Sequence, residues 1–172
     1  MKSAFLWFCV LLPAICCGEG ILQKKAVLIL PDHVEYKSGS GYYLSGEMAF
    51  RWDEPNPLKI WVWRDPESKK ESDTPNHLQG DLEVFDETGE KLEQHFFVSM
   101  PPPPDSEIVI NGGEYRRFGF FIWNGSVVFP RPGNYYAVAT FRHAWTGKIN
   151  VVFTTSKRWF IVGEAPPKKS SL

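Results

Sequence analysis

The fold is decided by residues 130–142, which read PRPGNYYAVATFR. Two prolines fix their own φ angles, and Gly133 supplies the conformational freedom that a corner requires, so we expect a turn followed by a strand. Alternate residues of a strand point to opposite faces, which places four residues on one apolar face: Tyr135, Ala137, Ala139 and Phe141. This stretch therefore predicts a corner that leads into a strand with one buried face.

The first 18 residues are typical of a secretory signal peptide. Lys2 precedes a short apolar run, and small residues follow as far as Gly18, although cleavage after Cys16 or Gly20 fits nearly as well. The run is shorter than the ~20 apolar residues that span a bilayer, so we expect no transmembrane segment in the mature chain. The predicted location is secreted or periplasmic. Lipid attachment at Cys16 or Cys17 is disfavoured, because neither cysteine follows a small residue.

The mature chain is expected to lack cysteine, because Cys9, Cys16 and Cys17 all lie in this signal. Its stability must then come from a packed core without disulfides, which favours a bacterial source. Residues 19–163 have the length of one domain, and residues 164–172 form a polar tail that we expect to be disordered. The formal net charge of -1 gives no basic excess for nucleic acid.

The composition predicts an all-β protein. Aromatic residues make up 15% of the chain, and fourteen glycines and fourteen prolines interrupt it before any long helical period develops. The cleanest strand pattern covers residues 44–52, where Met48, Phe50 and Trp52 alternate with more polar positions. Residues 58–63 are apolar on both faces and predict a central strand, and residues 149–162 predict the last one. About nine such strands indicate two packed antiparallel sheets.

A hairpin is expected between residues 78–84 and residues 92–98. Both segments alternate apolar and polar side chains, and the connection contains Gly89, which can close the turn.

These features resemble the immunoglobulin-like β-sandwich, with its Greek-key order of strands. The resemblance implies that Tyr135 is a corner tyrosine whose hydroxyl bonds back to the preceding loop. It also implies a core tryptophan, Trp61 or Trp63, that faces Ala137 and a residue of the 44–52 strand, either Met48 or Phe50. The chain departs from the pattern because it lacks the usual bridging cysteines. The resemblance concerns architecture and transfers no activity.

Catalytic, metal-binding and cofactor motifs are missing from the sequence, so we expect no cofactor. The four histidines have no metal-ligand spacing: His33, His77, His95 and His143. The chain contains no Gly-x-Ser-x-Gly elbow, phosphate loop or dinucleotide fingerprint. The two groups of clustered acidic residues, Asp53 with Glu54 and those between residues 65 and 73, fall in loops, where solvated side chains are the simpler interpretation.

The aromatic residues are the remaining candidates for binding. Most of the tryptophans are expected to fill the core. Trp145 is the exception, because it lies beside the turn at residues 146 and 147, and Tyr42 and Tyr43 follow a glycine-serine stretch. Exposed rings of this kind stack on sugars or anchor a protein partner.

The sequence therefore favours a non-catalytic exported binding or structural module that acts in protein–protein interaction or envelope assembly. For this function we expect a flat apolar patch or an open sheet edge, near Tyr136 and Val138 if their face is uncovered. One alternative is a module that binds a cell-surface glycan through exposed Trp and Tyr residues. A second alternative is a hydrolase or metal-binding protein, in which the fold would gather histidines and carboxylates.

Overall fold

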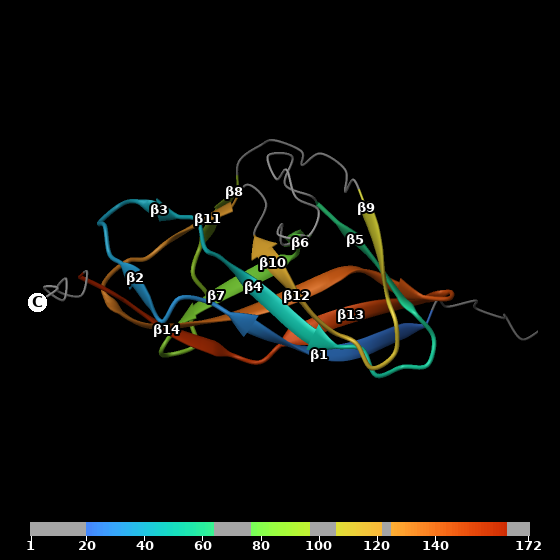
Figure 1. Cartoon of the computed structure of the whole chain (residues 1–172). Helices are drawn as coiled ribbons and strands as arrows, with labels where there is room; N and C mark the ends of the chain where they lie inside the picture. Colours follow the sequence, from blue (N-terminus) through green and yellow to red (C-terminus); the bar gives the residue numbers. More distant parts are fainter. Residues whose placement is uncertain (1–19, 64–76, 97–105, 122–124, 165–172) are drawn as a thin grey trace, which may run out of the picture.

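The computed structural model describes residues 20–63, 77–96, 106–121 and 125–164, and every regular element in these ranges is a strand (Figure 1). The all-β prediction is confirmed. The described residues include no helix that could span a bilayer. The expected signal peptide and the expected tail from residue 165 onward lie outside the described residues.

The described strands number fourteen, more than the nine expected, because several have only two or three residues. In chain order they are β1 (Ile21–Ile29), β2 (His33–Glu35), β3 (Gly41–Tyr42), β4 (Ser45–Arg51), β5 (Leu58–Val62), β6 (His77–Gln79), β7 (Asp81–Asp86), β8 (Gln94–Phe96), β9 (Ser106–Ile110), β10 (Tyr115–Phe121), β11 (Gly125–Val128), β12 (Gly133–Thr146), β13 (Ile149–Thr155) and β14 (Arg158–Gly163).

Eleven strands form one mixed sheet, and β3, β11 and β8 form a second, small sheet. The main path runs β2-β14-β12-β13-β1-β4-β10-β6, with β5, β7 and β9 attached beside it. Three pairs are parallel: β1 with β13, β14 with β2, and β10 with β6. The expectation of purely antiparallel sheets is therefore wrong. A period of two identifies the buried face of a strand but not the strand that pairs with it.

β12 is the centre of the main sheet. Its first half pairs with β7 and β14, and its second half pairs with β5 and β13. The pairing with β13 shifts register between Phe141 and Ala144, so Arg142 and His143 are both exposed. The shift is a β-bulge, which bends the strand and lets its two halves face different neighbours.

The main sheet folds into a layer that contains β12 and β13 and a layer that contains β4 and β10, and two connections join these layers. Residues 21–26 of β1 pair with β13, whereas residues 27–29 pair with β4. On the other side, Trp63 and His77 exchange backbone hydrogen bonds of 3.0 and 2.9 Å and join β5 to β6. Hydrogen bonding therefore runs around a closed circuit of seven strands: β12, β13, β1, β4, β10, β6 and β5.

The core lies between the β4–β10 layer and the β12–β13 layer. The Phe50 ring of β4 stacks on Phe153 of β13 at 4.1 Å and on Phe118 of β10 at 5.6 Å. Trp52 is fully buried beside Phe153, and its Nε1 donates to the Asn56 carbonyl at 2.7 Å. The alternation in residues 44–52 predicted this inward face.

The corner before β12 has the expected hydrogen bond. The Tyr135 hydroxyl donates to the Arg131 carbonyl at 2.7 Å, and its side chain is buried. Burial raises the pKa of Tyr135 above its ordinary value. Ala137 is fully buried on the same face of β12.

Replacing Tyr135 with phenylalanine should lower the free energy of unfolding by about 1 kcal/mol, because the Arg131 carbonyl loses its donor while the ring stays in place. Chemical denaturation measures the difference. Tyr115→Phe is the control, since that side chain is largely exposed. Equal midpoints for the two variants would contradict a structural role for the corner hydroxyl.

The two candidate core tryptophans point in different directions. Trp61 is 38% exposed on the outer surface of β5, because Leu58, Ile60 and Val62 take the inward positions. Trp63 is the buried one of the two, and its ring lies edge-on to His143 at 6.4 Å.

The hairpin expected through Gly89 is only partly formed. Gly89 adopts a φ of 91°, and the Leu92 amide donates to the Val84 carbonyl at 2.8 Å. Beyond this point the two segments separate, since β7 pairs with β12 and β8 pairs with β11. Each segment pairs with a strand that is distant in sequence, which a local pattern cannot reveal.

Candidate functional site

An aromatic row crosses three strands on the outer face of the main sheet. Phe85 of β7 stacks on Tyr136 of β12 at 5.0 Å, and Tyr136 contacts Trp159 of β14 at 4.8 Å. Ile161 follows at the next outward position of β14. Trp159 is 47% exposed and Ile161 is 52% exposed. We call Phe85, Tyr136, Trp159 and Ile161 the outer apolar patch.

The strand register explains this arrangement. Tyr136 lies opposite Phe85 on one side and Trp159 on the other, so its own ring is buried between them. The Lys157 ammonium lies 4.3 Å from the centre of the Tyr136 ring, a cation–π contact at the margin of the patch. The patch lies near the expected position, although the exposed side chains are those of β14, and Val138 is half-buried.

A gap opens where the last expected strand, residues 149–162, is interrupted. β13 ends at Thr155 and β14 begins at Arg158, and pairing between β1 and β13 ends with Ala26 opposite Thr155. The described backbone has no hydrogen bond between residues 27–29 and residues 156–158. We call this gap the seam. It forms an open groove of about 310 Å³ lined by Val27, Leu28, Ile29, Ser156, Lys157 and Arg158.

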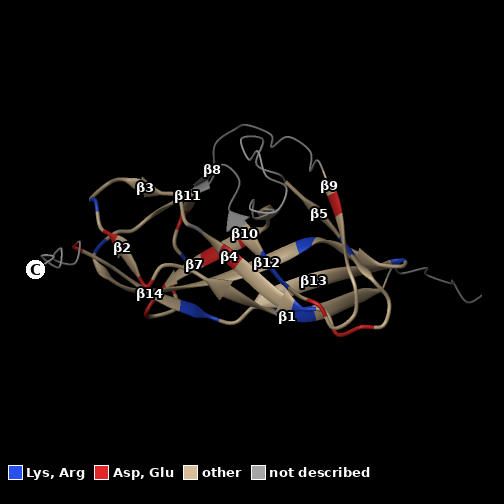
Figure 2. Cartoon of the chain, viewed as in Figure 1, with Lys and Arg blue, Asp and Glu red and all other residues tan. Residues whose placement is uncertain are grey.

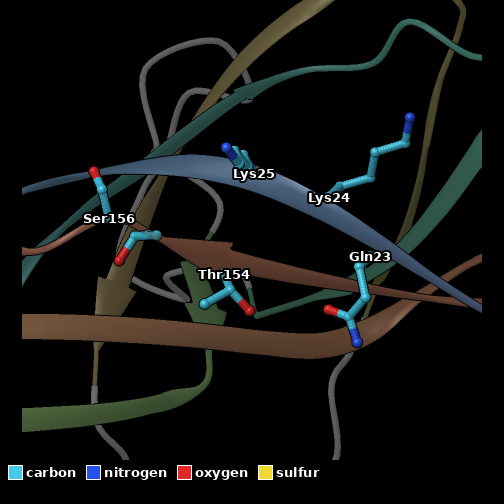
Figure 3. Close-up of a pocket in the computed structure, with 6 residues that line it drawn as sticks. Gln23, Lys24, Lys25, Thr154 and Ser156 are labelled. Carbon is cyan, nitrogen blue, oxygen red and sulfur yellow. The ribbon is translucent and has the colours of Figure 1, made fainter.

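A second groove continues from the seam along β1 and β13 (Figure 3). It has a volume of about 470 Å³ and shares Ser156 with the seam. Its remaining lining residues are Gln23, Lys24, Lys25, Thr154 and Thr155. The Thr155 hydroxyl is already used, since it accepts a hydrogen bond from the Ala139 amide at 2.9 Å. The groove is thus lined by ammonium, amide and hydroxyl groups.

Figure 2 marks the positions of the basic and acidic residues along the strands. The basic residues of the two grooves differ in their partners. Lys24 forms an ion pair with Glu54, and Arg158 forms one with Asp32 at 2.5 Å. By contrast, neither Lys25 nor Lys157 forms an ion pair with any described carboxylate. Lys25 is exposed at this end of β1, and the Lys157 ammonium contacts the Tyr136 ring.

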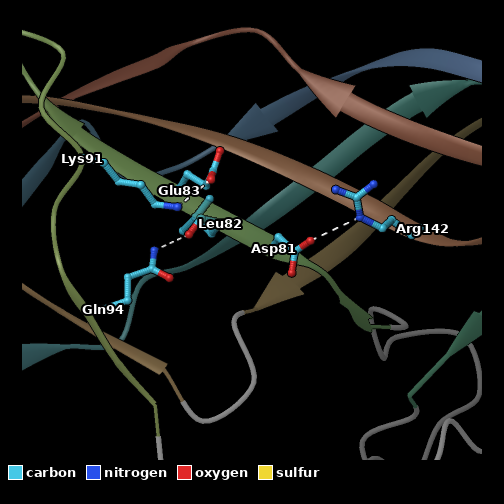
Figure 4. A network of polar contacts seen from close by, with 6 residues as sticks. All are labelled: Asp81, Leu82, Glu83, Lys91, Gln94 and Arg142. Atoms are coloured by element: carbon cyan, nitrogen blue, oxygen red, sulfur yellow. Dashed lines mark hydrogen bonds and ion pairs between the residues drawn. The ribbon is translucent and has the colours of Figure 1, made fainter.

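Side chains cover the edge of β7 that does not pair with β12 (Figure 4). The Gln94 side chain donates to the Leu82 carbonyl, and Lys91 pairs with Glu83 at 2.6 Å. Together with the Leu92 amide, these contacts cover the edge that β12 leaves open. Covering an edge in this way prevents unwanted strand pairing. At the seam, the Arg158 side chain donates to the Leu30 carbonyl at 3.1 Å.

Trp145, a predicted ligand residue, is half-buried and pairs with Trp61. Their ring centres are 5.9 Å apart and their planes are inclined by 40°. Lys59 lies opposite Trp145 in the register and forms an ion pair with Glu107 at 2.9 Å. The Trp61/Trp145 pair is thus a small aromatic surface with charged neighbours.

Tyr42 and Tyr43 do not join this pair. The Tyr42 ring packs edge-on against Phe129 at 5.1 Å, and its hydroxyl donates to the Lys37 carbonyl at 3.2 Å, so it supports the small sheet. Tyr43 is 69% exposed. Tyr42 is the last residue of β3, and Tyr43 follows it. β3 lies at the opposite end of the molecule from the C-terminal end of β12 (Figure 1). The structure thus divides the three predicted residues between two regions.

The carboxyl groups with shifted pKa belong to turns. The Thr88 hydroxyl and the Glu90 amide donate to Asp86 and hold the pKa of its carboxyl below the ordinary value. A hydrogen bond from the Asn111 side chain similarly lowers the pKa of Glu114. The described ranges contain no group of three or more His, Cys, Asp or Glu residues that could hold a metal ion.

Sequence reasoning missed the role of β14. Lys157, Trp159 and Ile161 point outward while Arg158, Phe160 and Val162 alternate with them. Because both sets include large apolar side chains, the segment was expected to be the end of one ordinary strand. The available signal was the polar pair at positions 156 and 157, which interrupts the apolar run.

Comparison with known proteins assigns no family to the chain. No family model matches it, and neither the curated proteins nor the solved structures contain a match.

Proposed function

We propose that this chain is an exported, non-catalytic module that binds a protein partner through the outer apolar patch. The observation that carries the proposal is the exposure of Trp159 and Ile161 at successive outward positions of β14, next to the open seam. Large apolar side chains gathered on a sheet surface are typical of interaction sites, and tryptophan is enriched among the residues that dominate binding energy.

The fold that we propose for this module is an immunoglobulin-like sandwich. The hydrogen bond from Tyr135 to the Arg131 carbonyl and the burial of Ala137 support it. The parallel pairs and the closed circuit are departures from the simple Greek key. Export is supported by the apolar run that follows Lys2.

The test is capture of a surface protein by the mature chain. A photo-crosslinker is placed at position 161, the captured protein is identified from a cell-surface extract of the source organism, and its affinity is measured with purified components. The double variant Trp159→Ser, Ile161→Ser should bind about thirtyfold more weakly, the effect of losing about 2 kcal/mol at a hot spot.

The control is Tyr115→Ser, which removes another exposed aromatic side chain away from the patch. It should bind as the unmodified chain does. Circular dichroism checks that both variants keep their strands. Unchanged affinity in the Trp159→Ser, Ile161→Ser variant would overturn the proposal.

A glycan is the second candidate ligand, and the Trp61/Trp145 pair favours it. The two neighbouring indole rings offer a surface for stacking on a sugar ring. The Lys59–Glu107 ion pair beside them offers hydrogen-bonding groups for the sugar hydroxyls. Titrating tryptophan fluorescence with a glycan panel separates the candidates. A response that Trp145→Ala abolishes and that the Trp159→Ser, Ile161→Ser variant retains would favour the glycan.

A further inference from the structure

β9 is a terminal strand of the main sheet, and one of its edges pairs with no described residue. Its ladder with β5 is regular over five residue pairs, from Leu58 opposite Ile110 to Val62 opposite Ser106. The other edge receives no ladder, bridge or loop hydrogen bond from the described parts of the chain. In an antiparallel ladder, alternate residues direct their N–H and C=O groups away from the partner strand. These groups of β9 therefore face outward.

The other edges of the main sheet are shorter or covered. β2 has only three residues, and β6, which also has three, bridges to Trp63. The Gln94 side chain and the Leu92 amide cover the edge of β7, and the Arg158 side chain donates to the Leu30 carbonyl at the seam. β9 contains no proline and no bulge, so it keeps the kind of edge that accepts another strand.

The sequence of β9 is self-complementary. Ile108, Val109 and Ile110 form an apolar triplet that reads the same in both directions, and Val109 is 45% exposed. The charged residue of the strand, Glu107, already pairs with Lys59 of β5 at 2.9 Å. When two copies of β9 are paired antiparallel about Val109, Ile108 of one copy lies opposite Ile110 of the other. Apolar side chains then oppose apolar side chains, and the two Glu107 carboxylates are not opposed.

We propose that the chain forms a two-fold dimer in which the β9 strands of two copies pair antiparallel about Val109. The pairing joins the two main sheets and covers the exposed Val109 side chain of each copy. A second copy fits this edge because a two-fold pairing uses both open edges at once and closes the assembly. The inference goes beyond the proposed function, since the outer apolar patch belongs to β7, β12 and β14.

Sedimentation equilibrium of the mature chain, from about 1 µM to about 1 mM, should show a mass that doubles with concentration. Val109→Lys places two ammonium groups opposite each other at the two-fold axis, so it should raise the dissociation constant of the dimer at least about tenfold. Val27→Lys is the matched control, because Val27 is also exposed, at 59%, but lies on β1. This control should dimerise as the unmodified chain does.

Opposite charges at position 109 give a test in which dimerisation is regained. Val109→Glu alone should weaken the dimer as Val109→Lys does. An equal mixture of the two variants should restore it, because unlike charges then meet at the axis. Circular dichroism checks that each variant keeps its strands. A mixture that stays monomeric while both variants are folded would overturn the pairing about Val109.

Cysteine crosslinking tests the register of the two strands. The mature chain is expected to lack cysteine, so a single introduced thiol reports contact between copies. Val109→Cys should form a disulfide-linked dimer under mild oxidation. Glu107→Cys should crosslink much more slowly, because the two thiol positions would lie about 13 Å apart, four residues at about 3.3 Å each. Equal crosslinking of the two variants would overturn this register.

Two further results would overturn the inference: a monomer at every concentration, or a dimer that Val109→Lys leaves unchanged. Loss of the dimer in the Trp159→Ser, Ile161→Ser variant would overturn it as well, because the copies would then associate through the outer apolar patch. Partner capture distinguishes this failure from failure of the proposed function. Capture that persists in the Val109→Lys variant leaves the proposed function standing whatever the state of the dimer.

Discussion

Replacing Trp52 with alanine should lower the free energy of unfolding by about 3–5 kcal/mol, the range for truncating a buried tryptophan. Trp52 is fully buried at the end of β4 and contacts the Phe153 ring across the core. Its indole also holds the following loop through the Asn56 carbonyl. Truncation therefore leaves both a cavity and an acceptor without its donor. Urea denaturation of the mature chain measures the loss.

Two variants control this result. Trp52→Phe keeps most of the buried area and removes the indole donor, so it should fall between the alanine variant and the unmodified chain. Trp159→Ala removes a half-exposed indole and should change stability much less. If Trp159→Ala were as destabilising as Trp52→Ala, the assignment of Trp52 to the core would be contradicted.

Replacing Gly46 with alanine should destabilise the fold by about 3 kcal/mol, the upper part of the range for overpacking. A Cβ atom at Gly46 would lie 2.4 Å from the Ile29 carbonyl oxygen and 2.5 Å from Leu30 Cδ2. The first of these atoms belongs to the backbone of β1 and cannot rotate away. The pairing of β1 with β4 must therefore shift. Denaturation gives the magnitude, and hydrogen exchange at residues 27–29 locates the change.

Gly133 offers a matched control for this substitution. A Cβ atom there would meet only Tyr135 Cε2 at 3.7 Å, an ordinary contact. Gly133 is the first residue of β12 and has no positive φ, so the expectation that the corner needs its conformational freedom is wrong. Gly133→Ala should therefore leave stability nearly unchanged. Similar midpoints for Gly46→Ala and Gly133→Ala would contradict the close approach of β1 and β4.

Sequence patterns predicted the faces of strands better than their partners. Alternation identified the buried Met48 and Phe50 on β4 and Trp52 directly after it, and the same rule placed Tyr135 and Ala137 inside. The parallel partners of β1, β2 and β6 could not be read in this way, because nothing in a strand's own sequence encodes the direction of a distant neighbour. The division of β1 between β13 and β4 was missed for the same reason.

The candidate site was accessible to sequence reasoning only in part. Tyr136 was identified as part of a possible apolar face, and Trp145 as a ring outside the full core. The seam depends on a two-residue break after Thr155 and on the departure of β1 from β13. The break has a local signal in the polar residues at positions 156 and 157, whereas the departure of β1 from β13 is a relation between distant segments, which composition and period cannot express.

The bridge between Trp63 and His77 has a consequence for how the molecule comes apart. A strand inside a ring is held on both flanks, so removing it breaks two ladders at once, whereas a terminal strand of an open sheet breaks one. Thermal opening should therefore begin at β2, β9 and the small β3-β11-β8 sheet, while the ring resists until it ruptures as a unit.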